Sequence, residues 1–201
     1  MGTAEPSNLS TQAPPAASRD VEERADRIDA LLPQTQCTRC GYGACRPYAE
    51  ALAQGEAQLN RCPPGGAEGI DALARLLGRA VLPLDPQCGV EQPARVAWIV
   101  AEACIGCARC LPACPVDAIL GAQQWLHTVL ANECTGCELC LSACPVDCIR
   151  ILPRAAQTPA PDAHSNRERF ERHRGRKQRL ARERDQVLAE RKRMAARCPA
   201  P

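Results

Sequence analysis

The chain reads CIGCARCLPACPVDAI over residues 104–119 and CTGCELCLSACPVDCI over residues 134–149. The two stretches align without a gap at an offset of 30 residues. Each follows a short β-like stretch, RVAWIV or HTVL, and each ends in another, near Ile119 or over residues 149–152. Each copy therefore predicts a strand, a cysteine loop, a short helix and a second strand. We expect residues 95–153 to form one pseudo-symmetric α+β domain.

Both copies contain the run C-x2-C-x2-C-x3-C-P, which is the bacterial ferredoxin pattern for two [4Fe–4S] clusters, with the fourth cysteine of each run ligating the other cluster. Gly106 and Gly136 allow the backbone to approach the sulfurs, and Pro115 and Pro145 end the helix before the chain turns away. Zinc is the alternative, but it prefers isolated sets of four ligands. The predicted ligands are Cys104, Cys107, Cys110 and Cys144 for the first cluster, and Cys134, Cys137, Cys140 and Cys114 for the second.

A third cysteine set lies upstream, in CTRCGYGACRPYAEALAQGEAQLNRC over residues 37–62, with the spacing C-x2-C-x4-C-x16-C. Helical patterns surround it: one from Asp20 as N-cap to the residue before Pro33, one over about 47–54 that ends at Gly55, and one over about 67–77. Residues 20–78 therefore predict a small helical domain around the set. Four thiolates suit zinc or an iron–sulfur centre, and the residues alone leave both open.

Composition favours metal ligation over disulfides. The chain has 15 cysteines but only five aromatic residues, so its small cores need cross-links or metals. The N-terminus has no apolar signal-peptide core, which predicts a reducing, cytoplasmic location, and an odd number of cysteines cannot all pair within one chain. No stretch reaches the roughly 20 apolar residues that span a bilayer.

Three segments lie outside the predicted domains. Residues 1–19 are expected to be disordered, and residues 79–94, with three prolines, to form a flexible linker. Residues 154–201 predict a basic, partly helical tail interrupted at Gly175. From Ser165 onward there are 13 Lys and Arg against 5 Asp and Glu, a net +8, which leaves −6 for the rest of a chain whose total is +2. Such a tail is a solvated face, or it binds nucleic acid or an acidic surface.

The order of the three cysteine sets, together with LLPQTQC before the first and LDPQCG before the second, resembles the RnfB family, the B subunits of Rnf (also called Rsx) electron-transport complexes. The resemblance covers about residues 28–153. It implies that Cys37, Cys40, Cys45 and Cys62 carry a third [4Fe–4S] cluster, and that membrane subunits of the Rnf type are partners at the inner face of the cell membrane. Typical members begin with a hydrophobic membrane helix and lack the basic tail, so we expect a soluble variant.

The sequence therefore predicts an electron carrier rather than an enzyme, because it lacks phosphate-loop, dinucleotide and Ser/His/Asp motifs. It would relay single electrons between a donor and an acceptor protein. The alternative is a two-cluster ferredoxin with a structural zinc at residues 37–62 and a tail that binds nucleic acid or an acidic surface.

The residues outside the three cysteine sets are interpreted as structural. Cys148, at the place of Ala118 in the other repeat, is expected to be a small buried residue, Cys88 a packed or free thiol, and Cys198 a free thiol. Tyr42 and Tyr48 are expected to shield the upstream cluster, His127 to be structural, and Asp117 and Asp147 to hold local turns.

Overall fold

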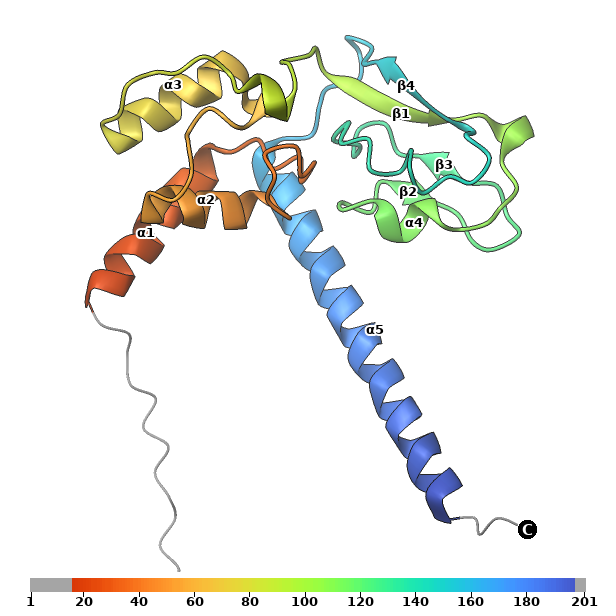
Figure 1. Ribbon diagram of the computed structural model, residues 1–201. Helices are drawn as coiled ribbons and strands as arrows, with labels where there is room; N and C mark the ends of the chain where they lie inside the picture. Colours follow the sequence, from red (N-terminus) through yellow and green to blue (C-terminus); the bar gives the residue numbers. More distant parts are fainter. Residues whose placement is uncertain (1–15, 198–201) are drawn as a thin grey trace, which may run out of the picture.

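A computed structural model describes residues 16–197 of the chain. Two small domains lie side by side, with a long C-terminal helix that starts between them and projects away (Figure 1). Most of the predicted disordered segment and Cys198 lie outside the described residues. No helix among the described residues is both long enough and apolar enough to cross a membrane.

The first domain is helical, as predicted. It contains α1 (Ala16–Leu31), α2 (Cys45–Gln54), the 3-10 turn η1 (Pro63–Gly65) and α3 (Gly66–Leu77). Helix α1 begins four residues before Asp20, so Asp20 lies inside the helix and is not its N-cap. Gly55 and Gly78 end α2 and α3 in the left-handed conformation, with φ of 80° and 63°. The core joins Ile28, Leu52, Leu59 and Leu73 to three of the four predicted ligands, Cys40, Cys45 and Cys62.

The second domain contains two antiparallel strand pairs, which confirms the α+β class. β1 (Arg95–Ile99) pairs with β4 (Ile149–Pro153), and β2 (Ile119–Leu120) pairs with β3 (Thr128–Val129). Between them lie η3 (Ala101–Ala103) and the single-turn helix α4 (Cys110–Ala113). The short helix predicted for the second repeat is wrong, because residues 139–143 form only turns. A separate core of eleven buried residues, five of them cysteines, fills this domain.

The segment between the domains packs against the first domain instead of forming a flexible tether. Its 3-10 turn η2 (Pro86–Cys88) is capped by the Asp85 carboxylate, which accepts a hydrogen bond from Gln87 N at 2.9 Å. The Asp85 backbone N–H donates to the Asn60 carbonyl at 2.9 Å, and the Asn60 side chain donates to the Pro83 carbonyl at 2.6 Å. These bonds fix the segment to the chain that leads into Cys62.

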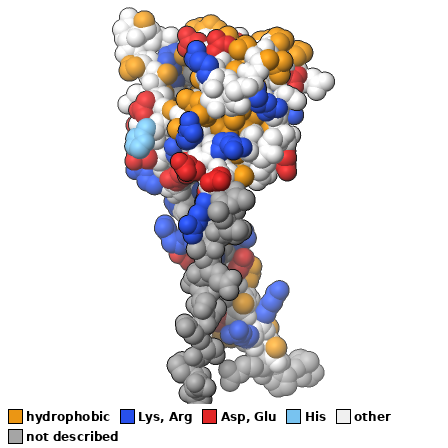
Figure 2. Space-filling view, turned by 90° about the vertical axis from the view of Figure 1, so that its left-hand side faces the viewer, with side chains coloured by type: hydrophobic (Ala, Val, Ile, Leu, Met, Phe, Trp, Pro, Cys, Tyr) orange, Lys and Arg blue, Asp and Glu red, His pale blue; other side chains and the backbone are white. Residues whose placement is uncertain are grey.

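The C-terminal helix α5 (Ala163–Arg197) is continuous. Asp162 caps it by accepting hydrogen bonds from Ser165 N and Oγ at 2.9 and 2.7 Å. The predicted interruption at Gly175 is wrong, because the helix runs straight through this residue, whose missing side chain faces open space. The part of the molecule that the two domains form carries mixed acidic and basic side chains where α5 leaves it (Figure 2). Hydrophobic side chains gather towards the end of this part that lies away from α5.

Candidate iron–sulfur sites

The second domain contains a cavity, here called the first cavity, whose lining thiols come from both repeats. The predicted first ligand set surrounds it, with Cys144 from the second repeat beside three cysteines of the first. This crossing is what the ferredoxin pattern requires. The other lining residues are Ile99, Ile105, His127, Val146, Cys148 and Ile149.

A second cavity repeats the arrangement with the roles of the repeats exchanged. Cys114 from the first repeat lines it together with three cysteines of the second, which is the predicted second ligand set. The lining also includes Ala97, Val116, Ala118, Ile119, Val129, Thr135 and Glu138, several of which lie 30 residues from a lining residue of the first cavity. No three His, Cys, Asp or Glu side chains in residues 16–197 meet closely enough to hold one metal ion.

The backbone of the two cysteine loops follows the same pseudo-symmetry. Left-handed φ values recur at matched positions: 67° and 69° at Gly106 and Gly136, and 59° and 67° at Ala108 and Glu138. Gly136 N donates to Cys134 Sγ at 3.5 Å, so the backbone does approach a sulfur there. Both glycines also lie against other backbone, because a Cβ on Gly106 or Gly136 would come within 2.9 or 2.6 Å of neighbouring backbone atoms. The loops therefore fit a group held by backbone N–H donors as well as by thiolates.

The upstream cysteines lie close together within the first domain. Burial raises the pKa of Cys62, and the charges of Cys45, Cys37 and Cys40 raise it further. Tyr48 is almost fully buried, and its hydroxyl donates to the Gln58 carbonyl at 2.8 Å. Its ring centroid lies 5.4 Å from that of Tyr42. Both rings pack into the core that contains Cys40, Cys45 and Cys62, which agrees with their interpretation as shields.

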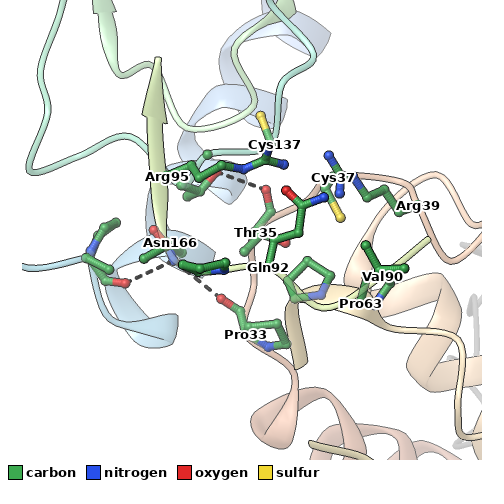
Figure 3. A pocket seen from close by; sticks show the side chains of 17 residues that line it. Pro33, Thr35, Cys37, Arg39, Pro63, Val90, Gln92, Arg95, Cys137 and Asn166 are labelled. Carbon is green, nitrogen blue, oxygen red and sulfur yellow. Dashed lines mark hydrogen bonds between the residues drawn. The ribbon is translucent and has the colours of Figure 1, made fainter. Parts of the chain in front are cut away.

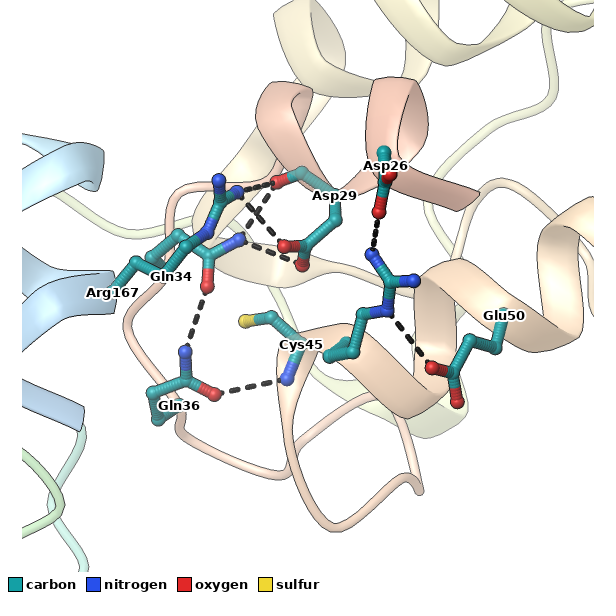
Figure 4. A network of polar contacts seen from close by, with 8 residues as sticks. Asp26, Asp29, Gln34, Gln36, Cys45, Glu50 and Arg167 are labelled. Atoms are coloured by element: carbon teal, nitrogen blue, oxygen red, sulfur yellow. Dashed lines mark hydrogen bonds and ion pairs between the residues drawn. The ribbon is translucent and has the colours of Figure 1, made fainter. Parts of the chain in front are cut away.

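A buried chain of polar side chains, which the sequence did not reveal, supports this upstream set (Figure 4). Gln36 Oε1 accepts from Cys45 N at 2.9 Å, and Gln36 Nε2 donates to Gln34 Oε1 at 2.8 Å. Gln34 Nε2 then donates to Asp29 Oδ1 at 2.9 Å, and Arg167 of α5 pairs with Asp29 Oδ2 at 2.9 Å. Gln34 and Gln36 are at most 2% exposed. Their left-handed backbone, with φ of 55° at both, turns them inward, and glutamine carries no local signal for that conformation.

The two domains meet at a cavity of about 260 Å³ that Cys37 and Cys137 both line (Figure 3). Thr135 Oγ1 donates to the Thr35 carbonyl at 3.1 Å across this junction. Glu138, which follows Cys137, forms ion pairs with Arg39 of the first domain and Arg95 of β1. The most exposed cysteine of the upstream set and the only half-buried cysteine of the second set thus line the same cavity.

Helix α5 contacts both domains, so the prediction of a solvated tail is wrong for its first half. Asn166 is 2% exposed and donates to the Pro33 carbonyl at 3.4 Å. Arg169 donates to the Val116 and Asp117 carbonyls and pairs with Glu133 at 2.8 Å. His173 and Arg176 both bind the Asp117 carboxylate, at 2.7 and 2.6 Å. Asp117 therefore holds a helix and not only a local turn.

His127 and Cys148 were expected to be structural, and the structure places both beside predicted ligands. His127 Nδ1 lies 3.4 Å from Cys104 Sγ, and Cys148 Sγ lies 3.4 Å from Cys144 Sγ. Cys148 is buried, as expected, but it also lines the first cavity. Cys88 is buried next to the upstream set, where it contacts Asp85 at 3.8 Å.

Several of the predicted ligand thiols resist ionisation, whereas at Cys144 burial raises the pKa less than hydrogen bonds lower it, so that its pKa lies below the ordinary value. Burial raises the pKa of Cys110 and Cys137 to about 11 and that of Cys45 and Cys140 to about 12. At neutral pH these groups keep their protons, so binding of iron must displace them. All fourteen cysteines in the described part of the chain are free of disulfides. Four thiols therefore line each cavity of the second domain, which is the number that an iron–sulfur cluster needs, and Cys40, Cys45 and Cys62 lie together in the core of the first domain.

Comparisons with known proteins agree with this chemistry. Residues 97–151 match the family described as "4Fe-4S dicluster domain", and residues 32–64 match the family described as "Putative Fe-S cluster". No solved structure matches the chain. The domains and their thiol sets define an iron–sulfur electron-transfer protein.

Comparison with individual proteins narrows this class of protein to one family. The chain is 63% identical over 131 residues to the B subunit of the ion-translocating oxidoreductase complex of Alkalilimnicola ehrlichii, covering 64% of this chain and 70% of that protein. It is 62% identical over 128 residues to the B subunit of Hahella chejuensis, covering 64% of each, and 60% identical over 105 residues to that of Azoarcus sp., covering 52% and 57%. The chain belongs to this family, the B subunits of ion-translocating oxidoreductase complexes.

Proposed function

We propose that the chain relays single electrons through three [4Fe–4S] clusters. Cys104, Cys107, Cys110 and Cys144 would hold the first, Cys134, Cys137, Cys140 and Cys114 the second, and Cys37, Cys40, Cys45 and Cys62 the third. The observation that carries the proposal is the crossed lining of the two cavities, each with three cysteines from one repeat and one from the other. When bound, such clusters take up and release one electron at a time.

The residues around the thiol sets support a relay in series. The shared lining of the junction cavity by Cys37 and Cys137 favours exchange between the third and the second set. The interleaved ligands of the ferredoxin domain favour exchange between the second and the first. Seven of the twelve proposed ligand cysteines are buried in the two domain cores, which limits the access of water to the sites.

The partners in this proposal are redox proteins at both ends of the relay. The relatives are named as components of an ion-translocating oxidoreductase complex, and we extend that assembly to this chain. Thiol-rich sites persist in reducing compartments, which favours the cytoplasmic face of the cell membrane. Co-purification of the tagged chain with membrane proteins of its own cell would test this, and its recovery without any of them would contradict it.

The decisive test is metal analysis of the full chain after anaerobic reconstitution. We expect about twelve iron and twelve sulfide per chain, and about eight of each in Cys45→Ala. Cys88→Ala is the matched control, because Cys88 is buried beside the same set and is not a proposed ligand. About eight iron with one zinc in the unmodified chain would overturn the third cluster. Clusters that dithionite cannot reduce reversibly would overturn the relay.

A further inference from the structure

The two cavities of the ferredoxin domain differ at two polar positions. Cys148 lines the first cavity where Ala118 lines the second, although the two residues lie 30 positions apart in matching repeats. His127 lines the first cavity, whereas Ala97, 30 residues earlier at the matching position of the first repeat, lines the second. Because the two cavities are related by pseudo-symmetry, their linings can be compared position by position, and each cavity serves as a control for the other.

Cys148 adds a donor that the second cavity lacks. One backbone donor is common to both cavities: Cys148 N donates to Cys144 Sγ at 3.4 Å, and Ala118 N donates to Cys114 Sγ at 3.2 Å. The second cavity has two further backbone donors, because Ala97 N and Gly136 N each donate to Cys134 Sγ at 3.5 Å. Only the first cavity adds a side chain, with Cys148 Sγ 3.4 Å from Cys144 Sγ. A sulfur bound to iron has lost its proton, so Cys148 is the only possible donor in this pair once Cys144 is a ligand.

His127 adds a second donor at the opposite end of the same ligand set. Its ring is 5% exposed, and Nδ1 lies 3.4 Å from Cys104 Sγ. Gly121 makes room for the ring, since a Cβ there would come within 2.0 Å of it. Nε2 is buried and, among residues 16–197, has no hydrogen-bond partner. An iron-bound sulfur only accepts, so the contact is a hydrogen bond when Nδ1 carries the proton.

Hydrogen bonds to ligand sulfurs stabilise the reduced cluster, because reduction adds negative charge that the donors offset. We infer that His127 and Cys148 donate hydrogen bonds to Cys104 and Cys144 and raise the reduction potential of the first cluster above the value that it would have without them. Greater exposure acts in the same direction, since three of the four cysteines of the first set are half-buried, against one of the second. The inference rests on the proposed function.

The test is an anaerobic potentiometric titration of the reconstituted full chain, followed by electron paramagnetic resonance. In Cys148→Ala and in His127→Leu, we expect the ratio of reduced to oxidised first cluster at a fixed potential to fall threefold to tenfold, or about 30 to 60 mV. Ala118→Cys is the reciprocal variant and should raise the potential of the second cluster. His127→Asn returns an N–H near the position of Nδ1 and should recover most of the loss.

Each outcome separates a tuning role from a packing role. Iron per chain is measured on the same samples, and an unmodified chain without iron on these sets overturns the proposed function itself. Full iron with potentials unchanged in both Cys148→Ala and His127→Leu overturns only the tuning. Equal shifts in His127→Leu and His127→Asn assign the effect to ring volume and contradict the hydrogen bond. Cys148→Ala should shift the reduction step of the first cluster, and Ala118→Cys should shift that of the second. A shift of the same step in both variants would contradict the inference.

Discussion

At the scale of single residues, the cysteine loops depend on glycines as much as on thiols. Gly136 lies next to Cys137 with φ of 69°, and a Cβ there would lie 2.6 Å from the Arg95 carbonyl oxygen. Both the backbone conformation and the space exclude a side chain. The same backbone conformation places Gly136 N 3.5 Å from Cys134 Sγ, to which it donates a hydrogen bond. Gly136 therefore determines both the shape of the loop and a hydrogen bond to a ligand sulfur.

We therefore expect Gly136→Ala to destabilise the ferredoxin domain by about 2 kcal/mol or more, because it combines a left-handed alanine with a backbone clash. For a domain of this size the Tm falls by about 10 °C. Gly69→Ala is the control: Gly69 lies in α3 with open space around it, so alanine should raise stability slightly. Anaerobic thermal denaturation measures both, and an unchanged Tm in Gly136→Ala would show that the loop adapts.

At the scale of elements, α5 links the two domains. Arg167 reaches Asp29 of the first domain, and Arg169 reaches Val116, Asp117 and Glu133 of the second. The Arg169 side chain is 19% exposed, so its charged hydrogen bonds lie largely out of water. The outer half of the helix makes no comparable contact among the described residues; Arg184, for example, touches only its neighbour Asp185.

Arg169→Ala should release the first turns of α5, because two carbonyls and one carboxylate lose their partner, at a cost of about 2 kcal/mol. Hydrogen exchange of the amides between residues 166 and 176 should accelerate at least tenfold. Arg184→Ala carries the same change of side chain at a site that is 71% exposed and should leave these amides unchanged. Equal exchange in both variants would mean that the other contacts of this part of the helix, which include those of Asn166, Arg167 and His173, hold it without Arg169.

At the scale of the whole molecule, the sequence predicted the ligand sets but not how the parts meet. The cysteine spacing is a local pattern, so the sets and the strands near Ile119 and Ile149 followed from the repeat. The buried face of α5 did not, because its partners Asp29, Asp117 and Glu133 lie far away in the sequence and a basic run by itself indicates a solvated face. The inward turn of Gln34 and Gln36 was missed for the same reason. Glutamine is usually exposed, and only the assembled domain shows what it binds.

The junction between the domains brings the Cys37 and Cys137 sites together, and Glu138 is its central charge. It pairs with Arg39 and Arg95 and is 22% exposed. Glu138→Gln removes the charge but keeps the side-chain volume, so two arginines lose their carboxylate and the junction loosens. We expect weaker magnetic coupling between the proposed third and second clusters in their reduced state, seen as narrower paramagnetic resonance lines, with all iron retained.

Glu50→Gln is the matched control for this prediction, because Glu50 pairs with Arg46 within α2 and takes no part in the junction. Its coupling should equal that of the unmodified chain. Unchanged coupling in Glu138→Gln would mean that Thr135 and α5 hold the domains without this ion pair. Weakened coupling would make the Glu138 carboxylate a condition for electron exchange between the domains, because exchange and magnetic coupling both depend on how closely the two clusters approach.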